Sequence, residues 1–310
     1  MSKTFCGPVL GVSLLVIGLA ILEPCSAEDN AVSGGLIAHW TFAEGSGDAI
    51  KDTSAKGNDG TIVPANTSKP KWGTGSFAGS IVFNGNDHFV RIPASASLNS
   101  LKKQISVVAL IYPRTLWTPI DRYISFAQRK WKQTVASAER MLGMATNSDR
   151  AHSSSSTGFI AIVQRQWRET IHPDQYYLGY GPKNNVLHYK WHLGLIGDDV
   201  DLYRLPKGQD KPRVGEWVHL AGTYNGETGK MSLYVDGDLI GTQTHTGEIR
   251  LDPESLNRPL AIGAELNGPS TDEPTGEFDG YIRDVRIYDR TLSDEEVKAL
   301  AQEAKRQVKK

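Results

Sequence analysis

The sequence predicts an all-β fold, a two-sheet antiparallel β-sandwich with a short C-terminal helix. Short runs of apolar or alternating residues recur along the 310-residue chain, and turn residues separate them. The 31 glycines and 15 prolines suit a chain with many short strands and turns. Helical periodicity is clear in one place, near the C-terminus. Together these observations favour a sandwich.

The first strand is predicted over residues 35–42. Apolar residues alternate with their neighbours there, at Leu36, Ala38, Trp40 and Phe42. This period of two is typical of a strand buried on one face. Turns follow at residues 44–48 and 56–60, where Gly, Asp and Asn gather.

Strands 80–83 and 87–93 flank Asn84-Gly85-Asn86, a sequence that favours a hairpin. Residues 104–113 are apolar almost throughout, as expected of a central strand. Later strands are predicted at 216–224, 231–235, 239–244, 260–263 and 278–288. The dipeptide Asp236-Gly237 predicts a two-residue hairpin between two of them.

The C-terminal helix has a clear beginning. Ser293 can cap its first turn, and Glu296, three residues later, completes a capping box. Apolar residues then follow at helical spacing, at Val297, Leu300, Ala301, Ala304 and Val308. We expect this helix to pack on the sandwich and residues 301–310 to form a basic helical tail, with binding of a partner as the alternative role for that tail.

Residues 1–27 resemble an export signal. Lys3 precedes an apolar run, and Glu23 to Ala27 supplies a helix breaker and small residues around a cut after Ala27. The run is about 15 residues long, short of the roughly 20 that span a bilayer. We therefore expect a secreted or periplasmic/extracellular protein with no membrane insertion after signal removal, and a retained anchor is the alternative.

Charge and cysteine content exclude several functions. The chain has 34 basic and 35 acidic residues, a net charge of −1, so long-range attraction to nucleic acid or anionic membrane is not expected. Both cysteines, Cys6 and Cys25, lie inside the signal. The remaining chain therefore contains no disulfide, no catalytic thiol and no cysteine metal site.

Five segments, in order, resemble the laminin-G-like jelly-roll domains of the concanavalin A-like lectin/glucanase group. They are Ala38–Gly47 followed by Asp52–Gly60, Phe83–Pro93, Gly215–Tyr224, Leu233–Gly237, and Phe278–Tyr288 with Arg290–Ser293 and Glu296. Ala55 stands where the family has a glycine. The resemblance implies a two-sheet jelly roll that often holds a structural calcium and often binds glycans. It predicts one domain over residues 28–300, with an insertion around 114–157, and says little about 114–213.

A calcium site needs several oxygen ligands close together. The candidates are Asp52, Asn58, Asp59 and Asp284. The first three lie in one loop, and the resemblance brings the first and last strands side by side. The alternative is that Asp52 caps its own turn and that Asp284 pairs with Arg283 or Arg286.

Sugar binding needs exposed aromatic rings and a few planar polar groups. Trp40 and Trp217 fall on core strands of the resembled family, so we expect both to be buried. The candidate ligand-binding residues lie in the middle region instead: Trp117, Trp131, Trp167, Tyr189 and Trp191. A separate hydrophobic cluster formed by these rings is the alternative.

A catalytic site is not predicted. Glu277-Phe278-Asp279 suggests the Glu-x-Asp motif of glucan hydrolases, but the third carboxylate of that motif is missing. The sequence therefore favours an exported lectin-like module that binds carbohydrate or a cell-surface ligand. If calcium occupies the Asp52/Asp284 site, we expect this binding to depend on calcium. The alternatives are a polysaccharide-active hydrolase or lyase on the same fold and a structural adhesion domain with a protein partner.

Overall fold

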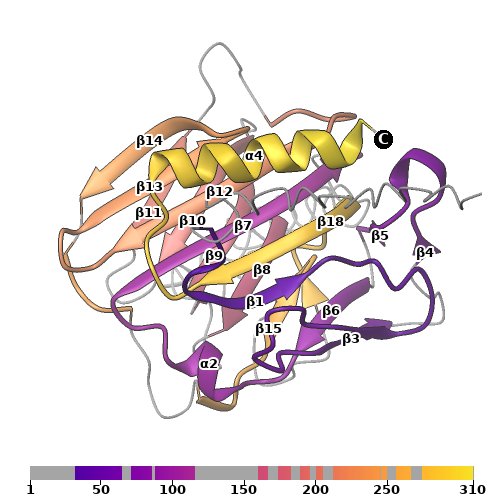
Figure 1. The fold of residues 1–310 in the computed structure, drawn as a ribbon, viewed down its shortest axis with the longest axis horizontal. Coiled ribbons are helices and arrows are strands. Elements are labelled where there is room, and N and C mark those ends of the chain that lie inside the picture. The colour runs from indigo at the N-terminus through magenta and orange to yellow at the C-terminus, as the bar shows by residue number, and fades with distance from the viewer. Residues whose placement is uncertain are drawn as a thin grey trace, which may run out of the picture.

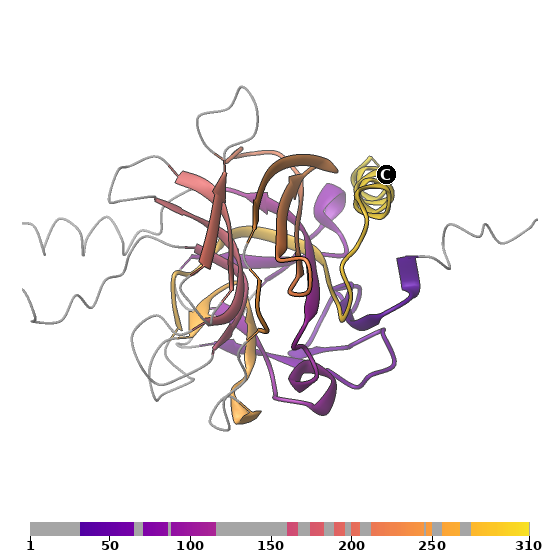
Figure 2. The same ribbon diagram turned by 90° about the vertical axis from the view of Figure 1, so that its left-hand side faces the viewer.

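The computed structural model describes most of the predicted strands and the C-terminal helix. The described residues are 32–64, 71–85, 88–115, 160–166, 174–182, 189–195, 200–204, 212–244, 246–249, 256–266 and 274–309. They form two large β-sheets that face each other, with helix α4 (Asp294–Val308) outside one of them (Figures 1 and 2). The predicted two-sheet antiparallel sandwich with a C-terminal helix is confirmed.

Sheet A lies beneath the helix. Its order is β14 (Asp238–Thr244), β13 (Lys230–Val235), β12 (Val218–Asn225), β7 (Gln104–Pro113), β18 (Asp279–Tyr288), β5 (Ile81–Asn84) and β4 (Lys71–Trp72). Strand β1 (Leu36–Trp40) also pairs with β18, so the first and last strands lie side by side as predicted. Strands β7 and β18 pair along almost their whole length at the centre.

Sheet B forms the opposite layer. Its order is β11 (Val200–Arg204), β10 (Tyr189–Leu195), β9 (Asp174–Pro182), β8 (Ile160–Gln166), β15 (Leu260–Ile262), β6 (His88–Ile92), β3 (Gly60–Pro64) and β2 (Ala49–Ile50). The four strands β8 to β11 come from the middle region that the sequence motifs left open. Smaller elements are β16 (Glu265–Leu266), β17 (Pro274–Thr275), the 3-10 turn η1 (Gly75–Phe77) and the short helix α2 (Ala96–Asn99).

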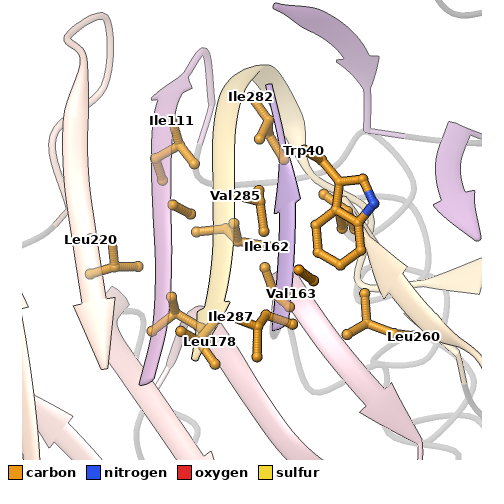
Figure 3. Close-up of a cluster of buried hydrophobic side chains, with 14 of the residues drawn as sticks. Trp40, Ile111, Ile162, Val163, Leu178, Leu220, Leu260, Ile282, Val285 and Ile287 are labelled. Atoms are coloured by element: carbon orange, nitrogen blue, oxygen red, sulfur yellow. The ribbon is translucent and has the colours of Figure 1, made fainter. Parts of the chain in front are cut away.

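The main core lies between the two sheets. In sheet A it includes Ile111, Leu220, Ile282, Val285 and Ile287, and in sheet B Ile162, Val163, Leu178 and Leu260 (Figure 3). Trp40 from β1 is fully buried in the same core, as predicted. Burial of this many aliphatic side chains is the main stabilising contribution to the sandwich.

Strand β7 is apolar on both faces because both faces are covered. Val107 and Ile111 point into the main core, whereas Val108 belongs to a second apolar cluster beneath α4. Val297 and Leu300 supply the helix side of that second cluster. The strand therefore has the burial pattern of a central strand even though it lies in an antiparallel sheet.

The predicted capping box of α4 is present. The Ser293 side chain accepts from the Glu296 backbone N–H at 3.2 Å, and the Glu296 carboxylate accepts from the Ser293 N–H at 2.8 Å. The helix continues without a break to Val308, and Ala301 and Ala304 are buried within it. The residues predicted to form a basic tail thus begin inside a packed helix.

The predicted Asp236-Gly237 hairpin joins β13 and β14. Both residues have positive φ, 55° and 88°, as a type I′ turn requires. The predicted burial of Trp217 is wrong, because this side chain is only partly buried on the outer face of sheet A.

Gly263 sits where a side chain cannot fit. Its φ is +86°, and an added Cβ would lie 2.3 Å from the Phe83 ring. We expect Gly263→Ala to lower the free energy of unfolding by about 3 kcal/mol, from overpacking and left-handed backbone strain together. Denaturant unfolding of the two proteins would measure the difference.

Gly47 provides the matched control. Its φ is +78°, but an added Cβ would meet no atom within 4 Å. Gly47→Ala should therefore cost only the backbone strain, about 1 kcal/mol. Equal losses for the two variants would contradict the close packing of Gly263 against Phe83.

Candidate functional site

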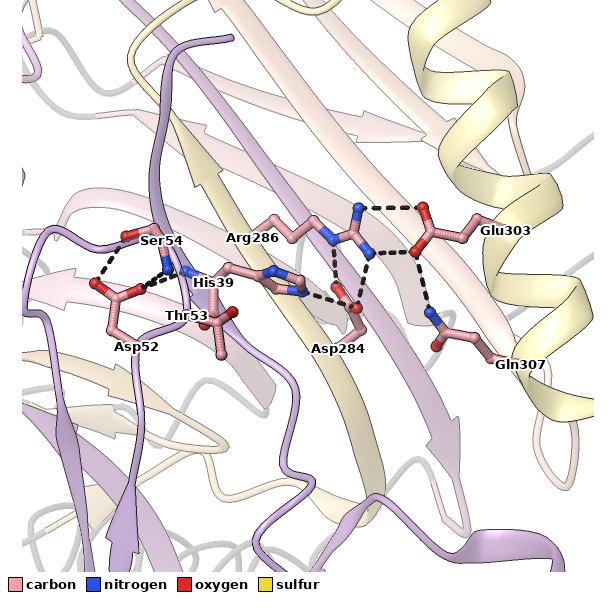
Figure 4. Close-up of polar contacts among 8 residues, drawn as sticks. All are labelled: His39, Asp52, Thr53, Ser54, Asp284, Arg286, Glu303 and Gln307. Carbon is pink, nitrogen blue, oxygen red and sulfur yellow. Dashed lines mark hydrogen bonds and ion pairs between the residues drawn. The ribbon is translucent and has the colours of Figure 1, made fainter. Parts of the chain in front are cut away.

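The predicted calcium ligands lie on the two sides of strand β1. His39 and Trp40 pair with Arg286 and Val285 of β18, and Trp40 also forms a bridge to Asp52 on the other side. His39 therefore lies between Asp52 and Asp284 (Figure 4). It bonds to the first through its backbone and to the second through its ring.

Asp52 organises its own loop. One carboxylate oxygen accepts from the backbone N–H groups of His39 and Ser54, both at 2.9 Å. The other accepts from the Ser54 hydroxyl at 2.8 Å and from the Asn58 N–H at 2.9 Å. Partial burial raises the pKa of Asp52, but these hydrogen bonds outweigh it and bring the pKa below its usual value. All four contacts are to donors of the protein itself.

Asn58 and Asp59 are also used within the fold. The buried Asn58 amide donates to the Ile37 carbonyl at 2.7 Å, and its oxygen accepts from the Ser97 hydroxyl at 3.1 Å. The exposed Asp59 accepts from the Lys51 ammonium at 2.6 Å and from the Asp52 N–H at 2.9 Å. Asn58 thus ties the loop to β1 and to the start of α2.

Asp284 is the buried centre of a chain of polar contacts. The Arg286 guanidinium donates to its two oxygens at 2.9 and 3.0 Å, and the His39 ring lies 3.1 Å from one of them. Arg286 also reaches Glu303 of α4, at 2.7 and 3.3 Å. This chain links β1, β18 and α4 (Figure 4).

The ion pair between Asp284 and Arg286 keeps both side chains charged. Burial raises the pKa of Asp284, but Arg286 and His39 outweigh burial and hold that pKa well below its usual range. Burial lowers the pKa of Arg286, and Asp284 and Glu303 reverse this and raise it. The pair is therefore ionised at neutral pH.

These four residues do not fit a shared calcium site. Asp52 is saturated by N–H and O–H donors, and Asp284 is neutralised by Arg286. Among the residues that the structure describes, no group of three or more His, Cys, Asp or Glu side chains could hold a metal. The contacts match the alternative interpretation, a turn cap at Asp52 and an ion pair at Asp284. Calcium bound by other residues stays a prediction.

The predicted sugar-binding aromatics are only partly covered by the structure. Trp117, Trp131 and Trp167 lie outside the described residues. Tyr189 and Trp191 both lie on β10, where Tyr189 is opposite Pro182 and Trp191 is opposite Tyr180 and Arg204. Strand β10 is next to the β11 edge of sheet B.

A different aromatic group lies on the outer face of sheet A. We define the outer aromatic cluster as Phe77, Tyr112, Trp217 and Tyr281, all partly buried. Phe77 stacks on Tyr281 with ring centroids 4.0 Å apart. The sequence gives little sign of this cluster, because its members come from four separate segments. The alternation along β7, which places Tyr112 on the same face as Val108, was the one available indication.

Arg283 ties the outer aromatic cluster to the end of α4. Its guanidinium lies 4.9 Å from the Trp217 ring centroid and donates to the Gln307 carbonyl at 2.8 Å and to the Ala78 carbonyl at 2.5 Å. Since Arg283 covers Trp217 and Phe77 stacks on Tyr281, these rings pack chiefly on neighbours within the protein. The cluster thus joins η1, sheet A and α4.

The Glu-x-Asp motif does not present two free carboxylates. Glu277 is buried, and Asp279 accepts from two nitrogens of Arg114, at 2.9 and 2.5 Å. Paired acid–base catalysis needs one carboxyl group free to act as an acid and another as a nucleophile or base. Asp279 instead holds Arg114 beside β18.

Comparison with known proteins agrees with this architecture. Residues 150–298 match the family model of the concanavalin A-like lectin/glucanases superfamily, Laminin_G_3. The match covers slightly less than half of the chain, and over this stretch the chain is similar to that superfamily. The predicted laminin-G-like resemblance is confirmed, and the match includes strands β8 to β11, which the sequence motifs left open.

Curated relatives match over a short part of their length. The chain is 38% identical to mouse pentraxin-related protein PTX3 over 89 residues, which is 28% of this chain and 23% of the relative. Human PTX3 is 36% identical over 88 residues, 27% of this chain and 23% of the relative. The chain thus spans less than a quarter of these proteins.

Solved structures share the fold at low identity. Domain 4 of AbnA, an extracellular arabinanase from Geobacillus stearothermophilus, was solved with arabinotriose and has a TM-score of 0.52 and 17% identity; the match covers 86% of this chain and 98% of that one. The botulinum neurotoxin serotype D/C binding domain has a TM-score of 0.54 and 12% identity, and the match covers 88% of this chain and 53% of the toxin chain. Trypanosoma rangeli sialidase has a TM-score of 0.52 and 14% identity, and the match covers 90% of this chain and 37% of the sialidase chain.

In the part of the chain that the structure describes, no helix is both long enough and apolar enough to cross a bilayer.

Removing the charge of Asp284 should destabilise the fold. In Asp284→Asn the buried Arg286 loses the buried anion that accepts two of its hydrogen bonds and keeps only Glu303, so we expect the free energy of unfolding to fall by roughly 3 kcal/mol. Asp59→Asn is the control, because its ion pair with Lys51 is exposed and should matter little. Denaturant unfolding at pH 7 would compare them, and a harmless Asp284→Asn would contradict the structural role of the pair.

Proposed function

We propose that the chain is an exported lectin-like binding module that recognises carbohydrate or another cell-surface ligand. The observation that carries the proposal is the likeness to domain 4 of AbnA, a domain solved with arabinotriose, which is matched over 98% of its length. A botulinum neurotoxin binding domain and a Trypanosoma rangeli sialidase share the fold as well. The fold alone does not identify the ligand, so the binding site has to be inferred from the chemistry of individual residues.

The proposed ligand surface lies at the β10 side of sheet B. Tyr189 and Trp191 are on this strand, and in the sequence Trp167 comes after Gln166, the last residue of β8. With Trp117 and Trp131, these residues give the middle region four tryptophans. Aromatic rings offer flat apolar surfaces against which the apolar faces of sugar rings can stack.

The outer aromatic cluster is a weaker candidate for the same role. Phe77 and Tyr281 stack on each other, and Arg283 covers Trp217. Rings that already pack on neighbours have less free surface for a sugar. This cluster therefore serves as an internal control for the proposed surface.

Export and calcium dependence are parts of the proposal that need their own tests. Export rests on the signal-like residues 1–27, which predict a secreted or periplasmic/extracellular location. Calcium dependence would have to come from ligands other than the set Asp52, Asn58, Asp59 and Asp284. A comparison of binding with calcium and with a chelator addresses it directly.

A glycan-array screen of the purified full chain, with calcium and again with a chelator, tests the function. Binding to a defined group of glycans is expected, and loss with chelator would show that calcium takes part. Absence of binding in both conditions would contradict the lectin proposal. Turnover of a polysaccharide would favour the hydrolase or lyase alternative, and capture of a protein ligand alone would favour the adhesion alternative.

Two tryptophan variants locate the surface. Trp191→Ala should weaken binding to the glycan found in the screen by at least about tenfold, which corresponds to the loss of about 1.4 kcal/mol of stacking. Trp217→Ala should leave the affinity unchanged while lowering stability. Isothermal titration calorimetry, with circular dichroism to confirm folding, would measure both. The reverse result would move the site to the outer aromatic cluster.

A further inference from the structure

The interface between α4 and sheet A changes character along the helix. Near its start, Val297 and Leu300 pack on the apolar cluster that contains Val108 and Tyr234. Toward its end the contacts become polar, and Arg286 of β18 pairs with Glu303 of the helix. The second half of α4 is therefore held to sheet A by ion pairs more than by apolar packing.

His219 on β12 lies within this polar part. Its side chain is buried, with 3% of its surface exposed, and neither ring nitrogen has a hydrogen-bond partner in the described structure. It faces a small cavity between the sheet and the helix. The cavity is lined by Val108, Leu110, His219, Asp284, Arg286, Leu300, Ala304 and Gln307. Its free volume of ≈ 10 Å³ is at the lower limit for one water molecule.

Several charged groups surround this imidazole. Asp284 and Arg286 lie on β18, Glu303 lies on α4, and Asp236 follows β13. Arg213 is paired with Asp236, and His39 contacts Asp284 from β1. Burial is the largest effect and lowers the pKa of His219 to about 4, although Asp284 and Asp236 favour its charged form. The ring is therefore neutral at pH 7.

We propose that His219 and the Asp284–Arg286–Glu303 ion pairs form an acid-sensitive latch that releases the second half of α4 from sheet A when His219 is protonated. An imidazolium in this cavity would lie beside Arg286, with room for at most about one water. It can be hydrated only if the helix moves away. Asp284 stays bound to Arg286 in this range, because Arg286 keeps the pKa of Asp284 far below that of His219.

The direction of the pH effect follows from proton binding. In the released state His219 is exposed to water and has its ordinary pKa of about 6.5, whereas in the closed state that pKa is about 4. The closed state therefore binds fewer protons between these values. The equilibrium ratio of the closed to the released state therefore falls by up to about tenfold per pH unit as the pH drops from 6.5 to 4. This ratio changes little above pH 6.5.

Hydrogen–deuterium exchange of the full chain between pH 7.5 and 4.5, corrected for intrinsic exchange, tests the latch. The opening constant of amides in the second half of α4 should rise by up to about tenfold per pH unit below 6.5. Amides of β7 should keep their protection. Unchanged protection of α4, or an equal loss in β7, would overturn the proposal.

Two variants separate the latch from general weakening of the helix. His219→Gln removes the titrating group and should make α4 exchange independent of pH in this range. Glu303→Gln keeps His219 and loses one ion pair, so exchange of α4 should rise at every pH while the slope remains. A pH slope that persists in His219→Gln would exclude His219 as the sensor.

A direct titration covers the case in which His219→Gln does not fold. NMR of the wild-type chain, with the His219 ring resonances assigned, gives the pKa of this side chain. A value below 5 is expected for the closed latch. A value near 6.5 would mean that the ring is accessible to water at all times and would overturn the proposal.

Discussion

The pairing of β7 with β18 at the centre of sheet A is the interaction on which the rest of the described structure depends. These strands lie far apart in the chain, yet they pair over most of their length. One face of the pair contributes to the main core between the sheets, and the other supports α4. Strand β1 also pairs with β18, so the N-terminal strand is anchored at the same place. Loss of this pairing would uncover both apolar clusters at once.

The chain of polar contacts from His39 to Glu303 adds specificity to this arrangement. Moving charges out of water costs several kcal/mol per ion, and the attraction between Asp284 and Arg286 repays that cost only with good geometry. Arg286 meets both carboxylates through paired hydrogen bonds, which supplies that geometry. The chain joins β1, β18 and α4 in one arrangement, whereas apolar contacts alone would tolerate several positions of the helix.

Local patterns were sufficient for much of the fold. The Asp236-Gly237 turn and the Ser293/Glu296 capping box each depend on neighbouring residues, and each is present. The strand predicted in residues 35–42 is also present, over Leu36–Trp40, but a bulge between Leu36 and Ala38 breaks its alternation. The hairpin predicted at Asn84-Gly85-Asn86 is wrong, because β5 lies in sheet A and β6 in sheet B. The candidate site was less predictable. Asp52 has the residue type of a calcium ligand, but its acceptors are filled by N–H and O–H groups of its own loop and of β1. Residue type cannot show which donors the fold brings to a carboxylate.

The sequence by itself determined the fold class, the positions of most strands and the start of the final helix, because periodicity, turn chemistry and capping are local properties. Only the tertiary structure decided which polar groups meet. The contact of His39 with Asp284, the cover of Arg283 over Trp217 and the enclosure of His219 beneath α4 all join segments distant in sequence. Such contacts depend on strand order and on the faces that each sheet presents, and no local pattern encodes either.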